Sequence, residues 1–142
     1  MLENFRSDIS SCAKKYSNVV LICDDDLYDR NFEKSFSARQ FHFGKSTANI
    51  LAAACGLAYV GKLPFVLVKA SEILAATDQI KRLIVDPNLN VKIIAVGEGE
   101  NGEIVSSIEG LNHIVVDNAG DLEKTVFDMA NSYGPSYLAL KA

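Results

Sequence analysis

Apolar residues along this chain alternate between two patterns, one typical of buried strands and one typical of amphipathic helices. Continuous runs rich in β-branched residues, such as NVVLICDDD (18–26) and NVKIIAVG (90–97), predict strands buried on both faces. Between such runs the apolar positions recur at helical spacing, as in residues 2–16. Strands that alternate with helices predict an α/β fold, an open, mostly parallel sheet of about six strands with helices on both faces.

The expected elements fill residues 1–142 as one domain, without an internal repeat, a linker or a low-complexity segment. Helices are expected at residues 2–16, 29–37, 46–59, 71–85 and 119–132, and strands at residues 18–26, 40–43, 63–70, 90–97, 112–117 and 135–141. Ser71 is the expected N-cap of the fourth helix. The glycine-rich segment 97–103 is expected to form a loop.

Composition and charge exclude several classes of protein. The 142 residues are 49% hydrophobic and 23% charged, which is typical of a soluble globular domain. The net charge of -4 leaves no basic surface for nucleic acid. The longest apolar run, residues 50–57, is too short to cross a bilayer, and the acidic N-terminus does not resemble a signal peptide. We therefore expect a cytoplasmic protein that binds neither nucleic acid nor membrane.

The residue types that most often carry chemistry are few and scattered. Cys12, Cys23 and Cys55 are odd in number and widely separated, which favours neither a disulfide framework nor C-x-x-C metal spacing. His42 and His113 stand alone, and we interpret both as structural. No Ser-His-Asp or Cys-His arrangement can be argued from spacing. We therefore predict no catalytic residue and no metal ligand.

The segment GKST (44–47) matches the tail of a P-loop, the phosphate-binding loop of many nucleotide-binding proteins. A P-loop needs a glycine five residues before Gly44, where this chain has Arg39. The residues directly before Gly44 are bulky and typical of a strand. The favoured interpretation is a tight strand-to-helix turn in which Ser46 or Thr47 caps the following helix.

Three consecutive acids, Asp24, Asp25 and Asp26, follow the first expected strand. Open α/β sheets bind ligands at the carboxyl ends of their strands, so one interpretation is a ligand or metal site. The other is a solvated strand end at which Asp26 or Asp29 caps the next helix. The second is favoured because no other acidic or histidine cluster offers companion ligands.

A longer pattern carries a family resemblance. The chain has, in order, Phe41, Gly44, Asn49, Ala54, Gly56-Leu57-Ala58, Gly61, Pro64-Phe65-Val66 and Asp78-Gln79-Ile80. In this spacing residues 41–80 resemble the pyrimidine-binding (central) domain of transketolases and 1-deoxyxylulose-5-phosphate synthases, which depend on thiamine diphosphate. The flanking strands and helices extend the resemblance over nearly the whole chain. It implies the fold of that domain, with GKSTAN in the place of the family motif GIAEQN.

The resemblance also implies which residues would face the cofactor. In the family, the glutamate of GIAEQN hydrogen-bonds a ring nitrogen of the aminopyrimidine and helps to activate the cofactor. Thr47 stands at that position here, and a hydroxyl cannot supply a carboxyl proton. The aromatic residue that lines the pyrimidine pocket aligns with Glu72, or with Ile73 if the register shifts by one. Gly44, Thr47, Glu72 and Ile73 are therefore the expected cofactor-binding residues.

The resemblance leaves several functions open. The Gly-Asp-Gly motif, with which the family holds the diphosphate and Mg²⁺ on a separate domain, does not occur in the sequence. Thiamine diphosphate is therefore expected only with a partner domain. One hypothesis is a subunit of a split thiamine diphosphate-dependent enzyme, not competent for ketol transfer alone. The alternatives are a non-catalytic assembly module, forming a homodimer through the helix 46–59, and a pocket redirected to another small ligand.

Overall fold

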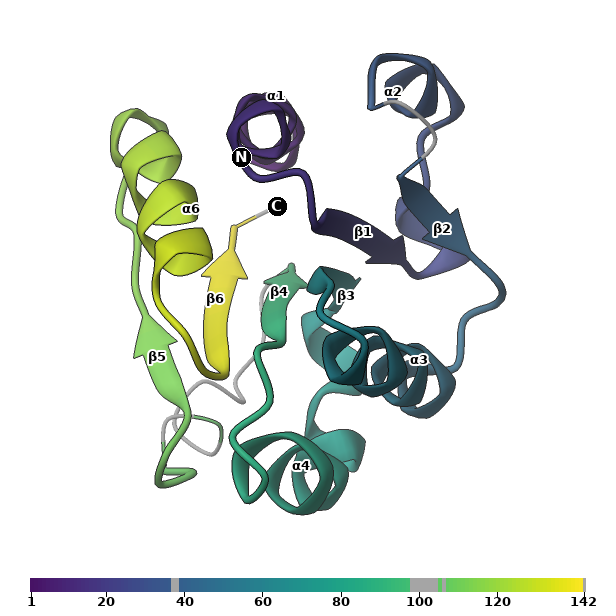
Figure 1. The fold of residues 1–142 in the computed structure, drawn as a ribbon, viewed down its shortest axis with the longest axis vertical. Coiled ribbons are helices and arrows are strands. Elements are labelled where there is room, and N and C mark those ends of the chain that lie inside the picture. Colours follow the sequence, from purple (N-terminus) through teal and green to yellow (C-terminus); the bar gives the residue numbers. More distant parts are fainter. Residues whose placement is uncertain (37–38, 98–104, 106, 142) are drawn as a thin grey trace.

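The computed structural model describes residues 1–36, 39–97, 105 and 107–141, and its strands form one six-stranded sheet (Figure 1). The strands are β1 (Val19–Cys23), β2 (Gln40–His42), β3 (Leu63–Lys69), β4 (Lys92–Val96), β5 (Asn112–Ile114) and β6 (Ser136–Leu140). They lie in the order β2-β1-β3-β4-β6-β5, and every neighbouring pair is parallel. The predicted open α/β sheet is confirmed. Most of the expected loop 97–103 lies outside the described residues.

Helices connect the strands and cover both faces of the sheet. They are α1 (Leu2–Lys15), α2 (Arg30–Ser35), α3 (Thr47–Tyr59), α4 (Thr77–Gln79), the π-helical η4 (Ile80–Val85) and α6 (Leu122–Asn131). Single 3₁₀ turns are η1 (Asp25–Leu27), η2 (Ala70–Glu72), η3 (Leu74–Ala76) and η5 (Ala119–Asp121). No helix in the described part of the chain is long and apolar enough to cross a membrane.

The expected continuous helix 71–85 with Ser71 as its N-cap was wrong. Two 3₁₀ turns precede α4, and Ser71 lies inside the first of them without capping it. The buried residues here are Ala70, Ile73 and Ala76, three positions apart. A 3₁₀ helix has three residues per turn, so this spacing aligns all three side chains on one face, toward the core.

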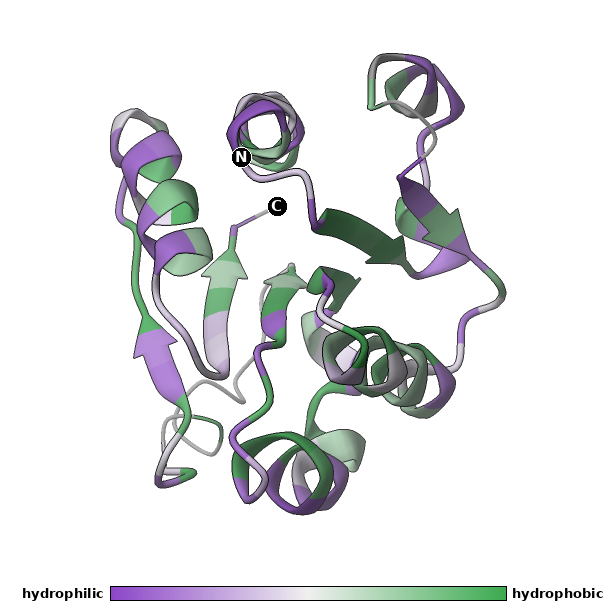
Figure 2. Cartoon of the chain, in the orientation of Figure 1, coloured by the Kyte–Doolittle hydropathy of each residue, from purple (hydrophilic) through white to green (hydrophobic). Residues whose placement is uncertain are grey.

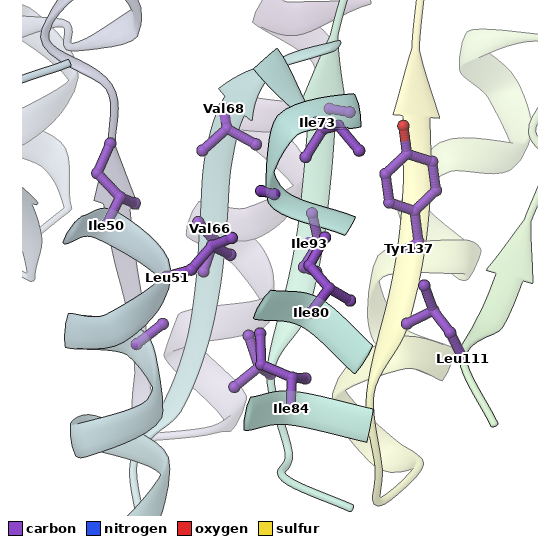
Figure 3. Packing of buried hydrophobic residues seen from close by; sticks show 14 of the residues in the cluster. Ile50, Leu51, Val66, Val68, Ile73, Ile80, Ile84, Ile93, Leu111 and Tyr137 are labelled. Carbon is purple, nitrogen blue, oxygen red and sulfur yellow. The ribbon is translucent and has the colours of Figure 1, made fainter. Parts of the chain in front are cut away.

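Alternate side chains of the inner strands enter two separate cores. In β3, Val66 and Val68 pack under α3 and the α4–η4 helix, whereas Phe65 and Leu67 pack under α1 and α6. Figure 3 shows the first core, in which isoleucines of α3 and of the α4–η4 helix face the strands. Figure 2 shows hydrophobic residues along β1 and β3, which are neighbours in the interior of the sheet. Burial on both faces explains why the strands are continuous apolar runs.

The turn before α3 follows the strand-to-helix interpretation of GKST. The Ser46 hydroxyl caps α3 by accepting a hydrogen bond from the Asn49 amide, at 3.3 Å. Beyond the other end of the helix, Gly61 has a φ of 88° and donates to the Ala58 carbonyl at 3.2 Å. A positive φ is easily adopted by glycine, so Gly61 ends the helix as its position in the sequence suggests.

Candidate functional site

The carboxyl ends of β1, β2 and β3 bring three polar segments together at one edge of the sheet. These are Asp24–Asp26 after β1, Gly44–Thr47 after β2 and Lys69–Glu72 at the end of β3, and we call them the carboxyl-edge cluster. The Asp25 amide donates to the Gly44 carbonyl at 3.0 Å, which joins the first two segments. Ligand sites of open α/β sheets lie at this edge, so the cluster is the candidate site.

Asp25 organises the turn that contains Gly44. Its Oδ1 atom accepts a hydrogen bond from the Gly44 amide at 2.9 Å and lies 3.0 Å from Nδ1 of His42. The Gly44 amide and then His42 lower the pKa of the Asp25 carboxyl. Gly44 has a φ of 121°, in the region that favours glycine. The His42 ring stacks on Tyr28, with centroids 3.8 Å apart. His42 thus has a structural role here.

Two lysines neutralise Asp26. Lys69 donates a hydrogen bond to Asp26 Oδ2, and Lys45 Nζ lies 3.0 Å from Asp26 Oδ1. Both lysines lower the pKa of Asp26, with Lys69 the larger cause, and Asp26 in turn raises the pKa of Lys69. Lys69 also lies 3.9 Å from Oδ1 of the buried Asp24. The lysines therefore offset much of the acidic charge in the cluster.

The acids after β1 cap helices rather than gather around a common centre. Asp24 Oδ1 accepts from the Asp26 amide at 2.8 Å and caps η1. Asp29 Oδ1 accepts from the amides of Asn31 and Phe32, at 2.8 and 3.1 Å, and so caps α2, one of the two capping choices expected from the sequence. Among the described residues there is no group of three or more side chains able to hold a metal ion.

Two buried polar atoms at this edge have no hydrogen-bond partner among the residues that the structure describes. Thr47, the first residue of α3, is 7% exposed, and its Oγ1 atom is unpaired. Asp24 is fully buried, and its Oδ2 atom is unpaired as well. Buried polar atoms in native structures are nearly always hydrogen-bonded, so each exception calls for a partner such as an ordered water or a ligand. Both atoms are therefore free to bond water or a polar ligand at this edge.

The other two expected cofactor-binding residues lie in different surroundings. Glu72 is exposed at the end of η2, and its charge contributes to the raised pKa of Lys69. Ile73 is fully buried in the core shown in Figure 3. The structure therefore brings Gly44, Thr47 and Glu72 to the carboxyl edge, while the Ile73 side chain packs in the interior.

The remaining histidine and the cysteines have structural surroundings. The His113 ring in β5 lies 5.4 Å from the ring of Tyr137, measured between centroids. All three cysteines are free and buried. Burial raises the pKa of Cys12 to about 11 and that of Cys23 to about 12, so both are protonated thiols at neutral pH and poor nucleophiles.

Comparison with known proteins supports the family resemblance. A Methanocaldococcus jannaschii protein named as a transketolase C-terminal section is 29% identical over an alignment of 160 residues. The alignment covers 99% of this chain and 50% of that protein. A solved split-gene transketolase superposes with a TM-score of 0.88 at 25% identity, over 98% of this chain and 50% of that one. The chain is similar to these transketolase sections over nearly its whole length, and we call it transketolase-like. It spans about half the length of the curated relative that it matches.

Two more distant structures share the fold of the transketolase-like domain. The transketolase of Campylobacter jejuni subsp. jejuni superposes with a TM-score of 0.73 at 13% identity, over 96% of this chain and 25% of that one. A thiamin diphosphate-dependent enzyme of Mycobacterium smegmatis has a TM-score of 0.71 at 13% identity, over 95% and 31% of the two chains. No family model matches the sequence.

Sequence reasoning missed two features of the transketolase-like domain. Lys69 was not predicted as a site residue, although it ends the apolar run of β3 at the same edge as the acids. The place of Lys69 at the end of a predicted strand was the available signal, because neighbouring parallel strands end at the same edge of a sheet. The unpaired atoms of Asp24 and Thr47 had no sequence signal, since they depend on which backbone amides lie within reach.

The pairing of Asp26 with lysines predicts a measurable pH dependence. The pKa of Asp26 lies below its ordinary value of 3.8, so its contribution to stability is complete above that value and is lost as the pH falls through the lowered pKa. Replacing Lys69 with methionine should raise the pKa of Asp26 in a carboxyl-carbon NMR titration. Lys124→Met, at an exposed lysine that pairs with Asp128, is the control. Equal Asp26 titrations in both variants would contradict the pairing.

Proposed function

We propose that this transketolase-like domain contributes the pyrimidine-facing half of a thiamine diphosphate site in a cytoplasmic enzyme of the transketolase type. The observation that carries the proposal is the unpaired, buried hydroxyl of Thr47 at the start of α3, the position that the family resemblance assigns to the pyrimidine ring. The relative named as a transketolase section and the solved split-gene transketolase support the reaction class.

The residues present fit one part of the cofactor's requirements. Thr47 Oγ1 can donate or accept one hydrogen bond to a ring nitrogen, and Gly44 keeps the turn beside it free of a side chain. Thiamine diphosphate, when bound, supplies the nucleophilic carbon that ketol transfer requires. Thr47 cannot supply the carboxyl proton that the family uses to activate it. The domain therefore fits ring binding and does not fit the proton transfer, and we assign it no catalytic residue.

We further propose that the site is completed by a partner that supplies the diphosphate-binding domain. The 142 residues of this sequence contain no Gly-Asp-Gly motif that would hold a diphosphate and Mg²⁺. The solved split-gene transketolase chain is described as an inactive β4 tetramer, which supports a domain that assembles with its own copies without being active. Tyr59, Val60, Leu74 and Leu83 are exposed apolar residues from the helices over one face, and they support a homo-oligomer, such as a dimer, through that face.

Reconstitution tests this proposal. The chain alone, with thiamine diphosphate, Mg²⁺, a ketose donor and an aldose acceptor, is expected to show no ketol transfer. Adding a separate chain that carries a Gly-Asp-Gly diphosphate domain is expected to produce cofactor-dependent transfer. Activity of the chain alone would contradict the half-site proposal. A stable oligomer that remains inactive with every such partner would favour the alternative, a non-catalytic assembly module.

A further inference from the structure

A second pocket lies at the amino edge of the sheet, the end opposite the carboxyl-edge cluster. It has a volume of about 250 Å³ and is bounded by the first residues of β4, β5 and β6 and by the end of α6. This is room for several water-sized molecules. Neither the family resemblance nor the proposed function uses this end of the domain.

Three polar side chains form a row across the wall of this pocket. Lys92, Ser136 and Asn112 are register partners on the neighbouring strands β4, β6 and β5. Register partners on adjacent strands direct their side chains to the same face of a sheet. Two residues further along, Ile94 and Leu138 lie in the core under α1 and α6, so the row faces α6. Strand register therefore places a lysine, a serine and an asparagine on neighbouring strands and on the same face of the sheet.

Lys92 is the charged member of the row. It is 1% exposed, and its Nζ atom donates to the carbonyls of Ser132, at 2.7 Å, and Gly134, at 2.5 Å, just after α6. An ammonium group has three donors, and these two bonds use two of them. Burial lowers the pKa of Lys92 to about 8, and no carboxylate is among the hydrogen-bond partners of Nζ. Lys92 is thus a buried cation without a counter-ion among the described residues.

Ser136 provides an independent sign of a ligand. It is 3% exposed, and its Oγ atom is buried without a hydrogen-bond partner. Ser136 is also one of the residues that line the pocket. An unpaired hydroxyl and an uncompensated ammonium in the lining of one pocket are suited to an acceptor that carries negative charge.

The other charged groups near the pocket do not neutralise Lys92. Asp128 lines it from α6, but its carboxylate accepts a hydrogen bond from Lys124 at 2.6 Å. Tyr133 also lines the pocket and is 75% exposed. Lys124, which lies outside the lining, pairs with Asp128, so Lys92 is the lining charge left without an opposite partner among the described residues. This charge favours an anion over a cation or a neutral ligand.

We propose that this pocket is a binding site for a small oxyanion, held by the Lys92 ammonium and the Ser136 hydroxyl, with the Asn112 amide at its edge. A carboxylate and a tetrahedral oxyanion share this chemistry. The anion supplies the counter-charge that buried Lys92 lacks, which offsets part of the cost of keeping an ammonium out of water. Binding therefore favours the protonated lysine, and anion affinity falls as pH rises through the lysine pKa.

Thermal unfolding of the full chain in increasing sulfate or acetate tests the site. Neither anion changes its charge between pH 7 and pH 9. Sulfate is a tetrahedral oxyanion and acetate a planar one, so their comparison shows which shape the site binds. A saturable rise in the midpoint temperature is expected with at least one of them. With a pKa of about 8, the protonated fraction of Lys92 falls about tenfold between pH 7 and pH 9. The apparent affinity should fall by about the same factor.

Variants separate the site from general salt effects, because sulfate also stabilises proteins without binding them. Ser136→Ala should weaken the saturable response several-fold, and Lys92→Met should abolish it. Lys62→Met removes the same charge at an exposed position outside the pocket and should leave the response unchanged. If Lys92→Met does not fold, the Ser136→Ala variant and the pH dependence of the unmodified chain still test the anion site. A response to both anions that does not saturate, or that is equal in Ser136→Ala and the unmodified chain, overturns the proposal.

Discussion

Replacing Thr47 with glutamate is expected to raise the rate of ketol transfer by about 100-fold or more once the domain is assembled with a diphosphate-domain partner. A positioned acid or base typically contributes about 10²–10⁴ to a rate, and the family resemblance places that group here. Position 47 begins α3 and is 7% exposed, so a carboxyl group there is largely removed from water. The comparison is of initial rates for the two reconstituted enzymes at saturating cofactor.

Thr47→Gln is the matched control for this gain. Glutamine has nearly the same size as glutamate and can hydrogen-bond the ring, but it has no carboxyl proton to exchange. We expect its rate to stay within a few-fold of that of the unmodified complex. Equal rates for the glutamate and glutamine variants would show that Thr47 does not occupy the place of the family's acid.

Replacing Ile73 with alanine is expected to lower the free energy of unfolding by about 2–5 kcal/mol. The side chain is fully buried between the sheet and the helices over it, so its removal leaves a cavity (Figure 3). Equilibrium unfolding in urea measures the change through the midpoint and slope. This result would assign Ile73 to the core rather than to the lining of a cofactor pocket.

Leu74→Ala provides the comparison for Ile73. Leu74 is the next residue along the same turns but is 49% exposed, so its truncation should change stability by no more than about 0.5 kcal/mol. If Ile73→Ala also stays within that range, the packing of this segment differs from the structure described.

The strands were predictable from the sequence because their burial leaves a simple signature. Each central strand is apolar on both faces, and the acids, lysines or glycines that follow mark its end. The segment 71–85 was not predictable in the same way. Its buried residues Ala70, Ile73 and Ala76 are three apart, and that spacing also fits one face of an α-helix. Only the packing against the sheet selects 3₁₀ turns there.

The candidate site was predictable only where it rests on a motif. The family pattern gave the positions of Gly44 and Thr47, and the fold places both on the turn before α3. It gave no reason to expect that Lys69 pairs with Asp26, or that the Asp24 carboxylate is buried with one oxygen unpaired. These features arise where three separate strands end together, and a linear pattern does not contain that proximity.

The central claim is that this domain holds half of a cofactor site, and calorimetric titration with thiamine diphosphate and Mg²⁺ tests it most directly. The chain alone should give no binding heat, because it lacks the groups that hold the diphosphate. The same chain mixed with a diphosphate-domain partner should bind the cofactor saturably. Saturable binding by the lone chain, or none in a stable complex of the two, would contradict the account.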